Sequence, residues 1–215
     1  MIPEVGHLAL IAHLALSFFA GVIPLFGIYF RNQALYFSCK RISLLLFSLV
    51  SLSFLCLVYS FLIDDFSVAY VAQNSNLNLP FYFKFAATWG AHEGSLILWI
   101  FAMNAWLLGF IYLTKSDDKS FSQVTFSIAC QVMFAFSLFT LFTSNPFERI
   151  LPIPPINGAD LNPSLQDIAF TVHPPLLYFG YSGLLIPFAI AVSAMIFQKE
   201  TKEWAASARP WALLS

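Results

Sequence analysis

Apolar segments long enough to cross a lipid bilayer occupy most of this 215-residue sequence. A transmembrane helix needs about 20 consecutive, mainly apolar residues. Stretches of this kind predict five membrane-spanning helices near residues 7–30, 41–63, 93–114, 121–143 and 174–198. Their apolar residues are continuous rather than alternating, which excludes a β-barrel, and an open sheet would leave backbone groups unpaired in lipid. We therefore expect an all-α integral membrane protein.

The composition agrees with a membrane protein. Hydrophobic residues make up 59% of the chain and charged residues only 10%, with a mean hydropathy of +0.77, whereas soluble domains carry about 25% charged residues. A net charge of −1 without runs of lysine or arginine gives no electrostatic basis for binding nucleic acid. Three cysteines without C-x-x-C spacing argue against a thiol–disulfide oxidoreductase.

The basic residues predict the orientation. Eight of the ten fall between spans one and two, between spans three and four, or after span five: Arg31, Lys40, Arg41, Lys115, Lys119, Lys199, Lys202 and Arg209. Cytoplasmic loops carry an excess of lysine and arginine, so this side is predicted to be cytoplasmic. The N-terminus is then periplasmic, the C-terminus is cytoplasmic, and two long periplasmic loops are expected near 64–92 and 144–173.

These two outer loops are rich in proline and asparagine, which is typical of defined turns. Loops of this length are more often functional than idle, so activity is expected on the outer face. Residues 205–215 look like the approach to a sixth span that is cut off as it begins. We expect residues 1–215 to form one membrane domain.

His173 is the first candidate site residue. Two prolines follow it, which disfavours helical backbone at His173 and suits Pro174 to the first position of a helix. The imidazole is thus expected near the helix N-cap at the outer face, as a capping residue or as an axial haem ligand. Tyr178 and Tyr181 follow, and Tyr181 could border a flat aromatic ligand.

The other polar residues are weaker candidates. His92, Trp99 and Trp106 form a stripe along the third span that is more typical of packing than of a cofactor wall. His7 and His13 cannot share a helix face, which argues against a self-sufficient b-type cytochrome, and no group of side chains has the spacing of a metal cluster. Four carboxylates are interpreted as solvated loop charges: Asp64, Asp65, Asp160 and Asp167.

Four motifs carry a resemblance to a known family. They are the W-G-A-H-E-G-S stretch at residues 89–95, S-N-P-F-E-R at 144–149, the D-L-N-P-x-L-Q-D pattern at 160–167 and H-P-P-L-L-Y at 173–178. In this order they resemble the cytochrome c-type biogenesis family of CcmF and NrfE. The likeness extends over nearly the whole chain, to the R-P-W at 209–211, and implies the N-terminal part of a CcmF/CcsA-type fold.

The resemblance implies a function. The family is a membrane subunit of the haem lyase that attaches haem to exported apocytochromes c. The resemblance implies haem as cofactor, as haem b delivered by the chaperone CcmE, and a CcmH-type thiol subunit as partner. The family's H-P-P-L-L-Y histidine, here His173, is an axial haem ligand on the outer face. Trp89, His92, Tyr178 and Tyr181 are the remaining candidates for contact with haem.

The resemblance also implies that the site is incomplete in this chain. The family's Trp-rich segment, its second outer-face histidine and the two histidines of a membrane haem b lie beyond residue 215. The chain is therefore not expected to be active or to bind haem stably without the C-terminal remainder. A haem or small-molecule transporter subunit and a purely structural membrane subunit stay open as alternatives. The expected location is a bacterial inner membrane, or else the mitochondrial inner membrane.

Overall fold

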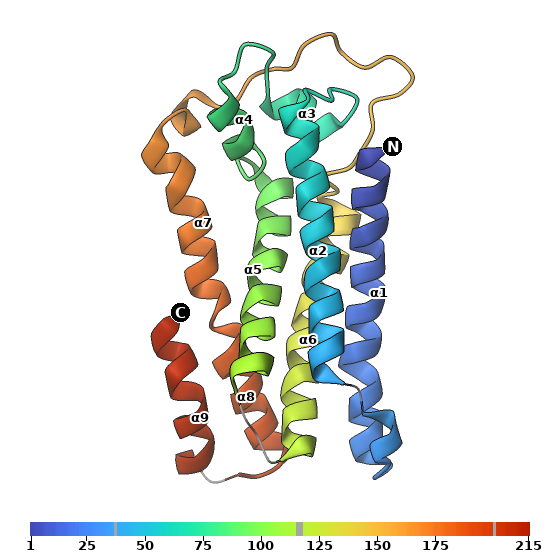
Figure 1. Cartoon of the computed structure of the whole chain (residues 1–215), viewed down its shortest axis with the longest axis vertical. Helices are drawn as coiled ribbons and strands as arrows, with labels where there is room; N and C mark the ends of the chain where they lie inside the picture. Colours follow the sequence, from blue (N-terminus) through green and yellow to red (C-terminus); the bar gives the residue numbers. More distant parts are fainter. Residues whose placement is uncertain (37, 115–117, 200) are drawn as a thin grey trace.

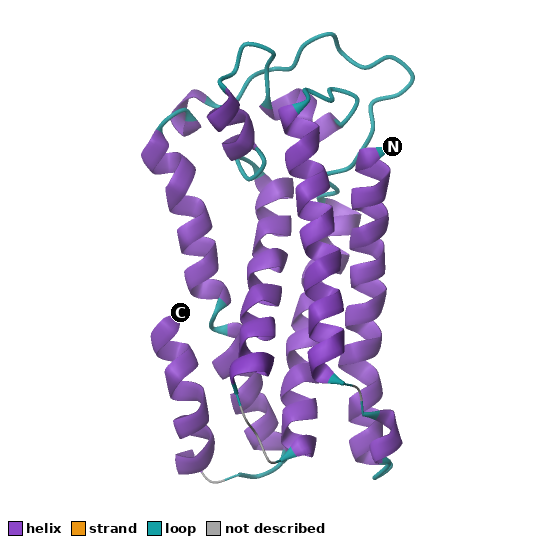
Figure 2. Cartoon of the chain, viewed as in Figure 1, coloured by secondary structure: helices purple, strands orange, loops and turns teal. Residues whose placement is uncertain are grey.

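The computed structural model describes residues 1–36, 38–114, 118–199 and 201–215, and helices account for nearly all of their regular structure. Within these residues, five helical segments are long and apolar enough to cross a membrane. Four are single helices, namely α1 (Ile2–Tyr29), α2 (Cys39–Leu62), α5 (His92–Leu113) and α6 (Lys119–Thr143). The fifth, Thr171–Ile196, combines α7 (Ile168–Ser182) with α8 (Leu185–Ile196). The helices run roughly parallel to one long axis (Figures 1 and 2).

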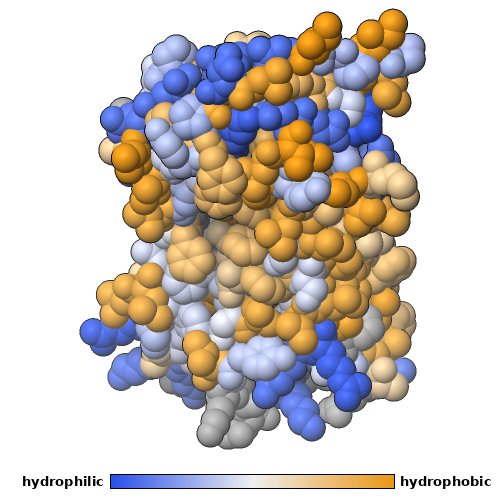
Figure 3. All heavy atoms as spheres, turned by 45° about the horizontal axis from the view of Figure 1, so that its top comes forward, coloured by the Kyte–Doolittle hydropathy of each residue, from blue (hydrophilic) through white to orange (hydrophobic). Residues whose placement is uncertain are grey.

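The shorter elements lie at the ends of this bundle. The predicted outer loop at 64–92 contains two short helices, α3 (Ala69–Asn74) and α4 (Phe81–Ala87). Three further elements are η1 (Gln33–Leu35), η2 (Pro163–Leu165) and α9 (Thr201–Leu214). The two long loops and the N-terminus share the upper end of the bundle in Figure 1, as the span order requires. Figure 3 shows an apolar band between two more hydrophilic ends.

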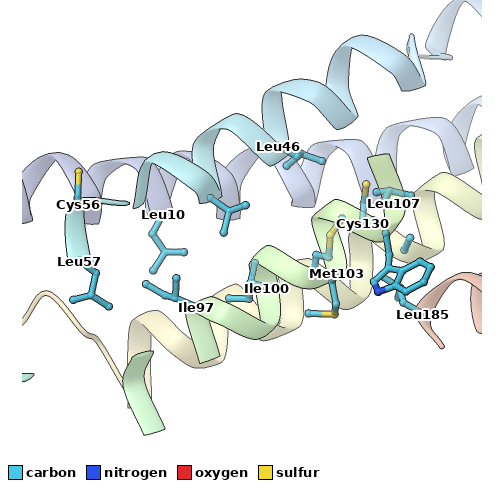
Figure 4. Close-up of a cluster of buried hydrophobic side chains, with 14 of the residues drawn as sticks. Leu10, Leu46, Cys56, Leu57, Ile97, Ile100, Met103, Leu107, Cys130 and Leu185 are labelled. Atoms are coloured by element: carbon cyan, nitrogen blue, oxygen red, sulfur yellow. The ribbon is translucent and has the colours of Figure 1, made fainter. Parts of the chain in front are cut away.

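The core lies where α1, α2, α5 and α6 meet. Helix α1 packs against both α6 and α2, and α2 packs against α5. Leu10, Leu57 and Ile97 are fully buried, and Figure 4 shows Leu10 and Ile97 pointing toward one another. Buried Met103 and Cys130 continue this core along the axis. Helices α7, α8 and α9 pack on one flank through α5 and α6.

The predicted start of the fifth span was wrong. Helix α7 begins at Ile168 because the side chain of Asp167 caps it, accepting a hydrogen bond of 2.8 Å from the backbone N–H of Ala169. His173 therefore lies more than one turn inside the helix, and Pro174 does not occupy its first position. The span is also interrupted between Ser182 and Leu185.

Candidate functional site

The two long loops join into one structure above the bundle, here called the loop cap (residues 63–80 and 144–167). An antiparallel bridge pairs Val68 with Arg149, and the backbone N–H of Ile150 donates to the carbonyl of Ser67 at 2.8 Å. A second junction is the 2.8 Å bond from the N–H of Ala159 to the carbonyl of Ala72. Main-chain hydrogen bonds thus tie together segments that are far apart in the sequence.

Ion pairs reinforce the loop cap. Lys84 is only 8% exposed, and its Nζ lies 2.5 Å from Oδ2 of Asp64. Arg149 lies 3.3 Å from Asp65 and 3.4 Å from Glu4 at the start of α1. The interpretation of Asp64 and Asp65 as solvated charges was therefore wrong, because both are paired and partly buried. Asp167 is exposed as expected, and its carboxylate also caps α7.

Tyr70 holds the turn between α4 and α5. Its hydroxyl oxygen accepts a hydrogen bond of 3.2 Å from the N–H of Ala91 and lies 3.2 Å from the carbonyl of Thr88. The side chain is 2% exposed, and burial raises the pKa of its hydroxyl well above the ordinary value. Gly94 permits this tight turn, because an added Cβ would come within 1.6 Å of the carbonyl oxygen of Thr88. Trp89 lies in this turn.

Trp89 links this turn to the backbone of α7. Its ring is 8% exposed, and its Nε1–H donates to the carbonyl of Thr171 at 3.1 Å. In an α-helix that carbonyl would accept from the N–H four residues later, but residue 175 is a proline and has none. The indole therefore replaces a missing helical hydrogen bond two residues before His173.

Trp106 makes an equivalent contact at the other end of α7. Its Nε1–H donates to the carbonyl of Phe179 at 2.7 Å. That carbonyl is available because the N–H of Gly183 turns instead to the carbonyl of Gly180, at 3.0 Å, where the helix ends. Two tryptophans thus satisfy the carbonyl that Pro175 leaves open and one at the helix break, and they hold α7 against α5.

His173 lies on the side of α7 that this packing leaves open. Its side chain is exposed, and in the part of the chain that the structure describes it has no side-chain hydrogen bond. The neighbouring Val172, Leu176 and Leu177 are 50%, 67% and 52% exposed. An exposed imidazole with apolar neighbours is suited to axial ligation of a haem iron, for which histidine is a usual protein ligand.

The other predicted site residues lie elsewhere on α5 and α7. Tyr178 and Tyr181 pack against Trp99 of α5. Their ring centroids lie 5.9 and 5.0 Å, respectively, from that of Trp99, so both rings face α5. His92 has its Nδ1 2.9 Å from the hydroxyl of Ser144 and its ring edge-on to a phenylalanine of α6. The structure thus brings Trp89 and Tyr178 together behind α7, while His92 is held toward α6.

One buried polar cluster was missed by the sequence reasoning. His13 is fully buried in α1, with Nδ1 3.0 Å from the hydroxyl of Ser137 on α6 and Nε2 3.0 Å from Nδ2 of Asn104 on α5. The signal was an amide and an imidazole near the middle of two apolar spans. Polar groups there are expensive unless paired, so the cluster ties three helices together. Among the described residues no group of three metal-ligating side chains was found.

Comparison with known proteins places the chain in a family. A family model described as cytochrome C assembly protein matches residues 89–215. The cytochrome c-type biogenesis protein NrfE of Haemophilus influenzae is 42% identical over all of this chain and 34% of its own length. CcmF of Escherichia coli is 41% identical over 99% of this chain and 33% of its own length.

A solved structure agrees in fold. The cytochrome c heme lyase CcmF matches all of this chain with a TM-score of 0.85 at 24% identity, over 33% of that chain. The chain spans about a third of the length of the curated relatives that it matches. The family model and the arrangement of helices agree, and the chain belongs to the family of cytochrome C assembly proteins.

Proposed function

We propose that the chain takes part in cytochrome c maturation as a membrane subunit of a haem lyase. Haem is the substrate, and His173 binds its iron at the loop end of the bundle. The exposed imidazole of His173 on the apolar outer side of α7 carries this proposal. The relatives named for cytochrome c-type biogenesis and the solved structure named heme lyase support it.

Each described residue near His173 has a specific part in this proposal. The neutral imidazole donates a lone pair to iron, while exposed Leu176 and Leu177 offer apolar contact to the porphyrin. Trp89, through Thr171, fixes the helix that carries the ligand. Haem supplies the vinyl groups that take the apocytochrome thiols, and the chain supplies binding and orientation.

The rest of the site belongs to other polypeptide segments in this proposal. The second axial ligand and an aromatic platform come from parts of the full-length relatives outside the matched third. Haem b arrives from CcmE, and a CcmH-type subunit and the apocytochrome bind at the loop cap. By the positive-inside rule the cap faces the periplasm of a bacterial inner membrane, and residues 1–215 act as one membrane domain.

The test replaces His173 in the full-length protein in cells. We expect His173→Ala to abolish haem-stained c-type cytochromes, while His173→Gly recovers part of the signal when imidazole is added to the medium. His7→Ala is the matched control, because His7 lies at the same end and stacks on Phe147 with centroids 6.3 Å apart. Normal maturation in His173→Ala, at wild-type protein level, would refute the ligand role.

A further inference from the structure

A cavity of about 520 Å³ lies at the end of the bundle opposite the loop cap. Residues at the start of α2, the end of α5 and the start of α6 line it, and Figure 1 shows these helix ends at the lower end of the bundle. Its polar wall carries two ammonium groups and several hydroxyls, from Lys40, Lys119, Tyr36, Ser38, Thr114 and Ser122. Phe110 and Ile111 form an apolar wall. Cationic and hydroxyl donors facing one space are suited to an anion.

Carboxylates do not neutralise this cavity among the described residues that line it. Asp118, which precedes Lys119 in the sequence, accepts a hydrogen bond from the N–H of Phe121 at 2.9 Å and pairs with Lys199 at 3.0 Å. It is thus engaged at the start of α6. The hydroxyl of Tyr36 is positioned by Ser120 at 3.1 Å. Among the described residues that line the cavity, Lys40 and Lys119 are thus the charged ones.

An apolar groove adjoins the cavity along the outer surface of α2 and α5. It has a volume of about 530 Å³ and is lined by residues that include Leu44, Phe47, Leu108 and Tyr112. Lys40 connects the two spaces, because it lines the cavity and its Nζ lies 5.6 Å from the ring centroid of Tyr112. Gly109 forms part of the groove, and an added Cβ there would meet nothing within 4 Å.

We propose that the cavity and the groove together bind one anionic phospholipid from the leaflet at the basic end of the bundle. The headgroup phosphate lies between Lys40 and Lys119, and the hydroxyls of the cavity contact its oxygens. One acyl chain follows the groove toward the bundle centre. Basic pockets between transmembrane helices are suited to lipid headgroups, and this site is independent of the proposed role in haem attachment.

The experiment titrates the purified protein in detergent micelles with dioctanoyl phosphatidylglycerol and counts bound lipid by native mass spectrometry. Phosphatidylcholine with the same chains and inorganic phosphate are the two comparison ligands. We expect one phosphatidylglycerol per protein, bound at least about tenfold more tightly than phosphatidylcholine. Lys40→Gln and Lys119→Gln each weaken it about fivefold, the usual effect of one lysine at an anionic surface.

Two further variants separate the headgroup from the chain. Arg41→Gln removes a neighbouring exposed charge that does not line the cavity, and it leaves the affinity unchanged. Gly109→Leu fills the groove from a position with free space and weakens binding without lowering the melting temperature. Equal binding of the two lipids, or unchanged affinity in either lysine variant or in Gly109→Leu, would overturn the proposal. Inorganic phosphate that competes as well as the lipid would show a free-anion site instead.

Discussion

Removing the indole N–H of Trp89 tests whether it replaces the helical hydrogen bond that Pro175 cannot make. In Trp89→Phe the carbonyl of Thr171 loses its 3.1 Å donor. Leaving a partly buried acceptor unpaired costs about 1 kcal/mol, and the smaller ring adds a packing loss because Trp89 is only 8% exposed. The variant alone cannot separate these two contributions.

A double-mutant cycle with Pro175→Ala separates them. Alanine restores an N–H at position 175, four residues after Thr171, where an α-helix makes its own bond. The loss of packing in Trp89→Phe is the same in both backgrounds, whereas the loss of the hydrogen bond is compensated only in the Pro175→Ala background. We expect a coupling free energy of about 1–2 kcal/mol, in the range measured for contacting groups.

The assay is hydrogen exchange of the full-length protein in detergent, measured on peptides from α7. Trp89→Phe is expected to speed exchange of amides near Thr171 about tenfold per 1.4 kcal/mol of lost local stability. Trp106→Phe is the matched control, because its indole bonds the carbonyl of Phe179, and it accelerates exchange near the end of α7 instead. Equal effects of Trp89→Phe in both backgrounds would refute the reasoning.

Further substitutions test the turn before α5, the Lys84–Asp64 pair and the start of α6. Gly94→Ala is expected to destabilise the fold by about 3 kcal/mol, because its Cβ would lie 1.6 Å from the carbonyl oxygen of Thr88; Gly109→Ala, with open space around it, should leave the melting temperature in detergent unlowered. Lys84→Met breaks a buried pair and costs about 3 kcal/mol, and adding Asp64→Leu should restore part of the lost melting temperature, whereas no recovery would contradict the pairing. Partial burial alone would raise the pKa of Asp118, but the N–H of Phe121 and the ammonium of Lys199 hold it below its ordinary value. A lowered pKa means that Asp118 stabilises the fold fully above about pH 4 and loses this effect as the pH falls through the folded pKa. The melting-temperature difference between wild type and Asp118→Ala should therefore shrink on acidification, and a constant difference would argue against the charge.

The spans were predictable because lipid imposes a simple requirement on sequence. A helix that crosses a bilayer has to be apolar along its whole length, so α2, α5 and α6 were predicted with ends that agree to within two residues. The prediction of an all-α membrane protein followed from the same requirement. The order of spans also predicted which loops share an end, as Figure 1 shows.

The start of α7 could not be predicted by the same local reasoning. The backbone preference before a proline argues against helix at His173, yet α7 continues through Pro174 and Pro175. Pro175 has no N–H to donate to the carbonyl of Thr171. The indole of Trp89, which lies 82 positions before Thr171 in the sequence, donates to that carbonyl instead. Prolines in membrane helices are tolerated where a neighbour satisfies the freed carbonyl, and that neighbour is defined only by the tertiary structure.

For the candidate site, the position of its main residue was predictable from the sequence, whereas the contacts between distant residues were not. The position of His173 near the loop-cap end of the fifth span follows from the sequence, and the structure leaves its ring exposed there. The pairing of Asp65 with Arg149, 84 positions away, does not follow from local patterns. Neither does the contact of His13 with Asn104 and Ser137, because each lies in a different helix.

The long-range pairs of the loop cap determine when this end of the protein can be completed during synthesis. Glu4 at the start of α1 meets its partner Arg149 only after α6 has been made and has returned the chain to the same end. The antiparallel bridge between Val68 and Arg149 depends on the same step. Chain segments are made and inserted from the N-terminus onward, so the first helices lie in the bilayer before Arg149 is available to pair with Glu4 and Asp65. Closure of the cap then comes as a late event, just before α7 brings His173 to the same end.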